Sequence, residues 1–203
     1  IVSDASIWLH DRGFHPPPPF LQMNSSYDGL LKKYDFINGI FIHVRYGDKF
    51  RWNYDKLKSK DPRLYILLKP SYYVDALKHF KTGSPVYIFS DSTFSKCLLQ
   101  DVLPDATFVD EGSYESFFCL SHCKHLVLSD STFGIAAMHL NSTPGLKIVA
   151  PGYTNDTLHK FKLMKTPFHY PASTHLVKDK SYILENTVET YKEIMDRCTA
   201  KVP

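Results

Sequence analysis

Hydrophobic residues gather in five short runs between residues 40 and 151, and segments with helical spacing separate these runs. The runs are rich in β-branched and aromatic side chains and are bounded by Gly, Pro, Asn, Asp or Ser, which predicts buried strands. They lie at residues 40–44, 86–89, 106–109, 125–128 and 147–150. Because strands and helices alternate, we expect an α/β fold: a Rossmann-like parallel sheet with helices on both faces and right-handed crossovers.

The apolar spacing between the strands predicts helices, with one exception. The exception is the polar, basic stretch Lys49 to Lys60, which we expect to be a long loop leaving the first strand. A capping box formed by Asn186 and Glu189 predicts a last helix. The other predicted helices lie within residues 21–37 and at 71–80, 94–102, 114–123 and 135–140.

The same pattern predicts one Rossmann-like domain over residues 38–203, preceded by an N-terminal arm over residues 1–37. The arm contains Pro16 to Pro19, and four consecutive prolines enforce an extended spacer.

Polar side chains follow three of the predicted strands. They are His43 and Arg45 near the end of the first strand with Asp48 just beyond it, Asp91 after the second, and Ser129 to Thr132 after the fourth. In a parallel sheet these ends meet at one edge, where α/β proteins bind ligands. Two alternatives stay open: Arg45 and Asp48 could form a salt bridge within a turn, and His43 could be a hydrogen-bonded core histidine.

The predicted start of the helix after the fourth strand suits a phosphate group. Ser131-Thr132-Phe133-Gly134 offers backbone N–H groups, hydroxyls and the positive end of a helix dipole. Arg45 would add a bidentate charge partner. Ser131 and Asp91 are also residues that commonly cap helices, so each of them alone is a weak signal.

Composition and missing motifs exclude several classes of protein. Twenty-four Lys and Arg against 21 Asp and Glu leave a formal charge of +3, which is too small to indicate nucleic-acid binding. The sequence lacks the glycine motifs of P-loop NTPases and dinucleotide oxidoreductases and the Gly-x-Ser-x-Gly elbow of hydrolases. It also lacks the Asp-x-Asp pair that holds a divalent ion on a nucleotide-sugar. We therefore expect a diphosphate site that uses no metal and no other cofactor.

Cysteines and sequons bear on the compartment. Cys97, Cys119, Cys123 and Cys198 show no zinc pattern, so disulfides and buried thiols are both open. Sequons at Asn24, Asn141 and Asn155 make these residues glycosylation candidates and favour the lumen of the secretory pathway.

The sequence contains no run of the ~18 apolar residues that a membrane span requires. The first residue is Ile1 rather than Met, so we expect a processed chain or a part of a longer one. Any membrane contact would then be made by a segment that is not present here.

The order of the motifs resembles the α-1,2-fucosyltransferase family. His43-Val44-Arg45-Tyr46-Gly47-Asp48 is similar to its His-x-Arg-x-Gly-Asp signature. Later segments are similar to its following motifs: Ile88 to Asp91, Cys123 to Leu126 with Ser131 to Asn141, and Ile148 to Pro151. The resemblance implies the donor-binding half of a GT-B glycosyltransferase, with residues 1–37 as part of the acceptor side.

The resemblance also implies a donor, GDP-fucose, and roles for single residues. Arg45 would bind the β-phosphate as a catalytic residue, and His43 would help form the donor pocket. Asp91 would lie on the nucleoside side, and Asp48 would be a catalytic base or would orient the acceptor. The residues that would line the diphosphate and the sugar are Ser131, Thr132 and Phe133.

The expected function is transfer of L-fucose from GDP-fucose to a hydroxyl of a glycan acceptor, with inversion and without a metal. The expected acceptor atom is the 2-OH of galactose, and the expected compartment is the Golgi. One alternative is a non-catalytic nucleotide-sugar or glycan-binding paralogue that lacks the acceptor half. Another is a plain α/β interaction domain without a ligand.

Overall fold

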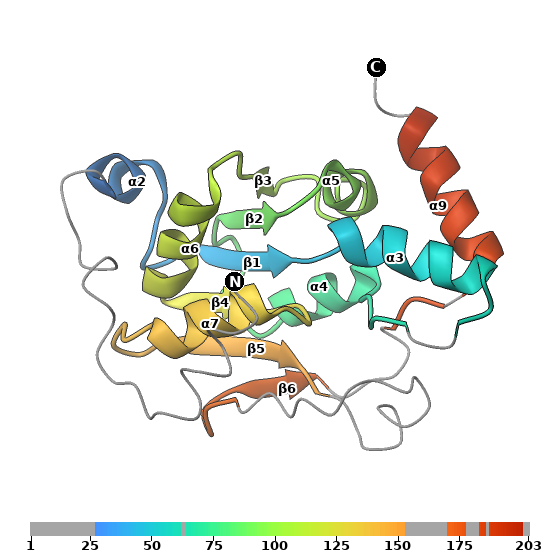
Figure 1. Ribbon diagram of the computed structural model, residues 1–203. Coiled ribbons are helices and arrows are strands. Elements are labelled where there is room, and N and C mark those ends of the chain that lie inside the picture. Colours follow the sequence, from blue (N-terminus) through green and yellow to red (C-terminus); the bar gives the residue numbers. More distant parts are fainter. Residues whose placement is uncertain (1–26, 62–63, 153–169, 178–182, 186, 201–203) are drawn as a thin grey trace.

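The fold is a six-stranded parallel sheet between two layers of helices (Figure 1). The computed structural model describes residues 27–61, 64–152, 170–177, 183–185 and 187–200. The strand order is β3-β2-β1-β4-β5-β6, and every neighbouring pair is parallel. The strands are β1 Ile40–Val44, β2 Val86–Ser90, β3 Thr107–Phe108, β4 His125–Val127, β5 Lys147–Pro151 and β6 His175–Val177. The predicted Rossmann-like fold class is confirmed.

Alternation along the strands builds two hydrophobic cores, one on each face of the sheet. On β1, Ile40, Ile42 and Val44 point to one face and Phe41 points to the other, and all five strand residues are buried. This matches the prediction of a strand buried on both faces.

The helices divide between these two faces. The first core is covered by α3 Gly47–Lys58, α4 Pro70–Leu77, α5 Thr93–Leu99 and α9 Val188–Ala200. The second is covered by α2 Asp28–Lys33, α6 Ser113–His122 and α7 Thr132–Leu140. The helices between β1 and β3 therefore cover one face and those between β3 and β5 cover the other, while α2 joins the second face and α9 joins the first.

Residues 47–58 form the helix α3, so the prediction of a loop over this stretch is wrong. Phe50 and Asn53 are fully buried, and Tyr54 and Leu57 pack against the same core. This is helical spacing, but a buried Asn interrupts the apolar stripe. The Asn53 amide nitrogen donates hydrogen bonds to the Tyr65 carbonyl at 2.8 Å and to the Tyr191 hydroxyl at 2.7 Å. These distant partners make a polar residue acceptable in the core.

Two differences from the predicted pattern lie at the C-terminal end. The helix α9 is capped by Thr187, whose hydroxyl accepts a hydrogen bond from the Thr190 N–H at 3.1 Å. Asn186, which was predicted to form the cap, lies outside the described residues. The sequence pattern also missed β6, a three-residue strand that pairs with β5.

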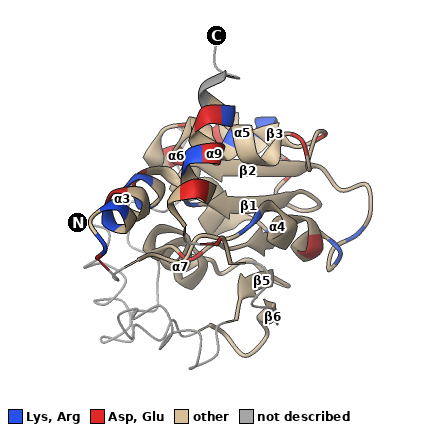
Figure 2. Ribbon diagram, turned by 90° about the vertical axis from the view of Figure 1, so that its right-hand side faces the viewer, with Lys and Arg blue, Asp and Glu red and all other residues tan. Residues whose placement is uncertain are grey.

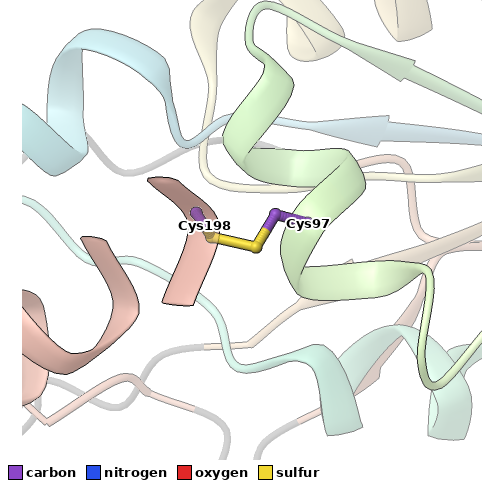
Figure 3. Close-up of a disulfide and its surroundings, with 2 residues drawn as sticks. All are labelled: Cys97 and Cys198. Carbon is purple, nitrogen blue, oxygen red and sulfur yellow. A yellow bond between two sulfur atoms is a disulfide. The ribbon is translucent and has the colours of Figure 1, made fainter. Parts of the chain in front are cut away.

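The helix α9 is fastened to both α3 and α5. Its Tyr191 is fully buried and packs on Phe50 with ring centroids 4.6 Å apart. Cys198 forms a disulfide with Cys97 of α5, with the two Cα atoms 5.5 Å apart (Figure 3). Cys119 and Cys123 are free and buried. One pair of the four cysteines is therefore a disulfide, and the other pair is two buried thiols.

The segment directly before β1 contributes to the second core. Leu30 of α2, with Tyr34 and Phe36, is buried against Phe41 of β1. Pro16 to Pro19 and the sequon residues Asn24 and Asn155 lie outside the described residues. The division into an arm over 1–37 and a domain over 38–203 stays a prediction.

Candidate functional site

Polar side chains converge where β1, β2 and β4 end. The strand order places β1 between β2 and β4, so these three ends are neighbours at one edge of the sheet. The order reverses at β1 and β4, and such a switch point opens the crevice in which α/β proteins bind ligands. Figure 2 faces this edge and shows charges of both signs on α3, the helix that leaves β1.

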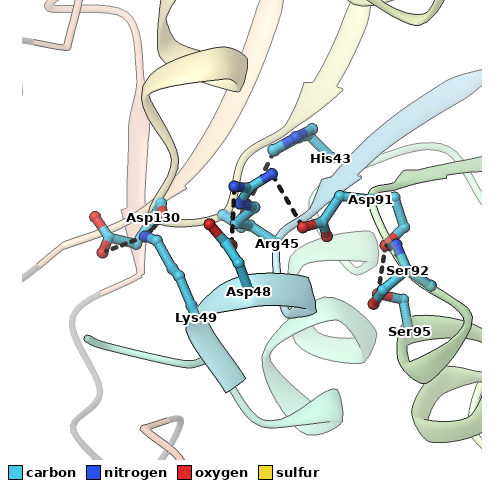
Figure 4. A network of polar contacts seen from close by, with 10 residues as sticks. His43, Arg45, Asp48, Lys49, Asp91, Ser92, Ser95 and Asp130 are labelled. Carbon is cyan, nitrogen blue, oxygen red and sulfur yellow. Dashed lines mark hydrogen bonds and ion pairs between the residues drawn. The ribbon is translucent and has the colours of Figure 1, made fainter. Parts of the chain in front are cut away.

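Arg45 lies between two carboxylates at the centre of this edge (Figure 4). Its Nη2 is 2.9 Å from Oδ1 of Asp48, and its Nη1 is 3.0 Å from Oδ2 of Asp91. The Asp48 side chain is 70% exposed and the Asp91 side chain only 22% exposed. Solvent therefore screens the pair with Asp48 more strongly than the pair with Asp91.

Asp91 is partly buried next to Arg45, in a space that Gly47 leaves open. Burial raises the pKa of the Asp91 carboxyl above its ordinary value, and the Arg45 charge and the Tyr46 backbone N–H oppose this rise. Gly47 makes the approach possible: a Cβ atom there would lie 2.0 Å from Oδ2 of Asp91. The glycine of the His-x-Arg-x-Gly-Asp motif thus leaves space for the carboxylate that holds the arginine.

His43 is a buried, neutral wall of the site. It is 4% exposed, its Nδ1 lies 3.1 Å from the Ser129 hydroxyl, and its ring stacks on Phe133 at 5.5 Å. Burial, reinforced by the charges of Arg45 and Lys49, lowers the pKa of His43 to about 3. The His43 ring therefore carries no charge near neutral pH.

A second ion pair, between Lys49 and Asp130, borders the first. The Lys49 ammonium donates a hydrogen bond to the Asp130 backbone carbonyl and lies 3.4 Å from Oδ2 of the same residue. The two side chains are only 15% and 16% exposed. Sequence reasoning missed this pair because Lys49 was placed in a loop. Its position directly after the Asp48 of the motif was the available signal.

The start of α7 presents a hydroxyl that does not cap the helix. Ser131 is the N-cap residue and is 5% exposed, but its side chain makes no capping hydrogen bond. Thr132 and Phe133 follow in the first turn and are partly buried. The first N–H groups of a helix have no partner within that helix, and together with the helix dipole they favour an anion at this position. All the predicted site residues therefore lie at the same edge, and contacts join His43 to Phe133 and Arg45 to Asp48 and Asp91.

Three further features of the described residues bear on the predictions. No group of three or more His, Cys, Asp or Glu residues there could hold a metal ion. None of the helices in the same part of the chain is long and apolar enough to cross a membrane. The Asn141 amide nitrogen, which N-glycosylation would modify, donates hydrogen bonds to the carbonyls of Leu120 at 3.2 Å and Cys123 at 2.8 Å. An attached glycan would displace one of these bonds.

A cleft of about 550 Å³ lies at the opposite edge of the sheet. None of the predicted site residues lines it, because its walls come from residues before β1, from the last turn of α6 and from the segment after α7. Its lining residues are Leu31, Tyr34, Asp35, Phe36, Ile37, Ser121, His122, Ser142, Thr143 and Pro144. We therefore place the candidate site at the edge where the polar groups converge.

Comparison with known proteins shows which family this chain matches. The model of the family described as Glycosyl transferase family 11 matches residues 30–170, a range that includes every motif quoted above. No curated protein matches the chain. Among solved structures, a NodZ alpha-1,6-fucosyltransferase soaked with GDP-fucose is similar with a TM-score of 0.37 and 15% identity. The likeness covers 61% of this chain and 42% of that one.

Proposed function

Because the chain belongs to glycosyl transferase family 11, we propose that it binds GDP-fucose and transfers L-fucose to a glycan hydroxyl. The observation that carries the proposal is the meeting of Arg45, Asp91 and the uncapped start of α7 at one edge of the sheet. A guanidinium and a helix N-terminus are two groups that bind a diphosphate without a metal ion. The family match confirms the resemblance drawn from the motifs, and the donor itself is part of the proposal.

Arg45 would exchange one carboxylate for a phosphate when the donor binds. The exposed Asp48 is the partner that a phosphate displaces, because solvent screens that pair. The less exposed Asp91 would stay and keep the guanidinium aimed at the edge. The role of Asp91 that the contacts support is thus to position Arg45, and its contact with the nucleoside stays a prediction.

The transfer step then needs charge stabilisation on one side and a base on the other. The bond between fucose C1 and the phosphate oxygen breaks, and Arg45 stabilises the negative charge that develops on GDP. The acceptor oxygen attacks C1 from the opposite face, which inverts the anomeric centre. Asp48, released from Arg45, takes the proton of the acceptor hydroxyl. His43 is a weaker base than Asp48 is asked to be, because burial and the charges of Arg45 and Lys49 lower its pKa to about 3.

The proposed acceptor atom is the 2-OH of galactose, and the proposed compartment is the secretory pathway lumen, with the Golgi as the site. The Cys97–Cys198 disulfide supports an oxidising compartment.

A transfer assay tests this function. We expect the chain, incubated with GDP-fucose and lactose in the presence of EDTA, to yield a fucosylated trisaccharide detectable by mass spectrometry. Asp48→Asn should keep GDP binding and lose transfer, because it removes the base. Tight GDP binding without any transfer would instead favour a non-catalytic nucleotide-sugar-binding paralogue.

A further inference from the structure

Two aromatic side chains stand exposed beside the donor edge. Trp52 of α3 is 46% exposed and Tyr65, in the segment before α4, is 38% exposed. Their ring centroids are 6.0 Å apart and the rings are tilted by 59°. We call Trp52 and Tyr65 the aromatic pair. Large aromatic residues usually bury their surface, so an exposed pair is a feature that function can explain.

The aromatic pair is continuous with the site through α3. Trp52 follows Asp48 by four residues and Lys49 by three, and on a helix these spacings place side chains on one face, with Cβ atoms about 5–6 Å apart. The Lys49 ammonium lies 5.1 Å from the centre of the Tyr65 ring, while the same atom pairs with Asp130. Asp48 therefore pairs with Arg45 and has Trp52 as its neighbour one helical turn further along α3.

The position of the aromatic pair is fixed from the interior. Asn53, which is fully buried, accepts a hydrogen bond from the Tyr65 N–H and donates one to the Tyr65 carbonyl, each at 2.8 Å. Lys56 lies 4.7 Å from the Trp52 ring centre and pairs with Asp61 at 2.7 Å. The backbone of Tyr65 is thus held to α3 while its side chain remains partly exposed. Rings held in this way lose little further conformational entropy when a ligand stacks on them.

We propose that the aromatic pair stacks a pyranose ring of the glycan acceptor and brings its hydroxyl to Asp48. This inference rests on the proposed function, because it assigns the acceptor subsite of the same reaction. Pyranoses present C–H groups on a ring face that pack against aromatic rings, and in galactose the hydrogens of C3, C4 and C5 share one face. Polar neighbours such as Lys49 can then fix the orientation of the sugar through its hydroxyls.

Trp52 offers a direct optical test. The sequence contains two tryptophans, Trp8 and Trp52, so Trp8→Phe leaves Trp52 as the single reporter. The protein is titrated with lactose, N-acetyllactosamine and diacetylchitobiose, both with and without saturating GDP. We expect a saturable blue shift of the emission with at least one of these saccharides, and no shift with sorbitol, which has no ring face.

Variants separate stacking from stability. Trp52→Ala and Tyr65→Ala should weaken saccharide binding about tenfold while the affinity for GDP stays unchanged, both measured by calorimetry because Trp52→Ala removes the optical reporter. The matched control is Tyr114→Ala, which removes an 80% exposed tyrosine from α6, a helix on the opposite face of the sheet. Saccharide binding by Tyr65→Ala equal to that of Tyr114→Ala would overturn the inference. So would an unchanged Trp52 emission with every saccharide in a protein that binds GDP.

The two proposals fail in different ways in this experiment. A saccharide response without GDP binding would leave the aromatic pair as a sugar subsite and would refute GDP-fucose as donor. GDP binding without a saccharide response would leave the proposed donor site standing and would refute the aromatic pair as a sugar subsite.

Discussion

At the scale of single residues, the candidate site depends on groups that no motif identifies as supports. The Ser129 hydroxyl lies within hydrogen-bonding distance of the His43 ring, and Asp91 forms an ion pair with Arg45. Both contacts join residues far apart in the sequence. Ser129 and Asp91 therefore determine the geometry of the site as much as His43 and Arg45 do.

The neutral state of His43 makes stability depend on pH. Its pKa is about 3 in the folded chain against an ordinary value of 6.5. The unfolded chain binds this proton below pH 6.5 and the folded chain does not, so the stability that His43 contributes is complete above 6.5. It is lost as the pH falls from there towards 3, by up to about 1.4 kcal/mol per pH unit.

We expect this loss to disappear in His43→Asn. Urea unfolding at about pH 7.5 and about pH 4.5 measures the free energy of unfolding of both proteins. Histidines common to the two proteins, such as His79 and His125, cancel in the difference. Equal pH dependence of the two proteins would show that His43 is protonated in the folded state.

Gly47 should control the site without controlling the fold. In Gly47→Ala the new Cβ would collide with Oδ2 of Asp91, and the flexible carboxylate must move away from Arg45. We expect GDP binding to weaken about tenfold while the midpoint of thermal unfolding changes little. Gly29→Ala is the matched control, because nothing lies within 4 Å of its added Cβ. Unchanged GDP affinity in Gly47→Ala would refute a positioning role for Asp91.

At the scale of elements, the regular strands were predictable, and the main exception, the helix α3, has an identifiable cause. Runs such as 40–44 are apolar on both faces, so the local pattern suffices to predict them. The helix α3 was mistaken for a loop because Asn53 occupies a core position. Its partners, Tyr65 and Tyr191, lie 12 and 138 residues away, and no local pattern indicates such contacts.

The helix α9 is attached to the rest of the domain by the Cys97–Cys198 disulfide and by the packing of Tyr191 on Phe50. The disulfide closes a separation of 101 residues, so removing it should lower the free energy of unfolding by roughly 2–4 kcal/mol. Urea unfolding of the double variant Cys97→Ser/Cys198→Ser measures this loss. A reductant should bring the wild type to the same stability and leave the double variant unchanged. A wild type insensitive to the reductant would contradict the disulfide.

At the scale of the whole molecule, the sequence indicated that the polar strand ends share one edge, and the strand order adds that they are neighbours. The order could not be predicted from periodicity, because alternation of strands and helices is compatible with several arrangements. With β1 between β2 and β4, Arg45 reaches Asp91 on one side and His43 reaches Ser129 on the other. The site is thus a property of the topology as much as of the motifs.

Calorimetric titration of the chain with GDP in the presence of EDTA tests the proposed donor site most directly. We expect saturable binding without a metal, weakened about a hundredfold in Arg45→Ala, which corresponds to roughly 3 kcal/mol. Arg51→Ala removes an exposed arginine from α3, the helix that follows Arg45, and should bind GDP like the wild type. Absence of GDP binding by the wild type, or equal affinities of Arg45→Ala and Arg51→Ala, would contradict a diphosphate site built around Arg45.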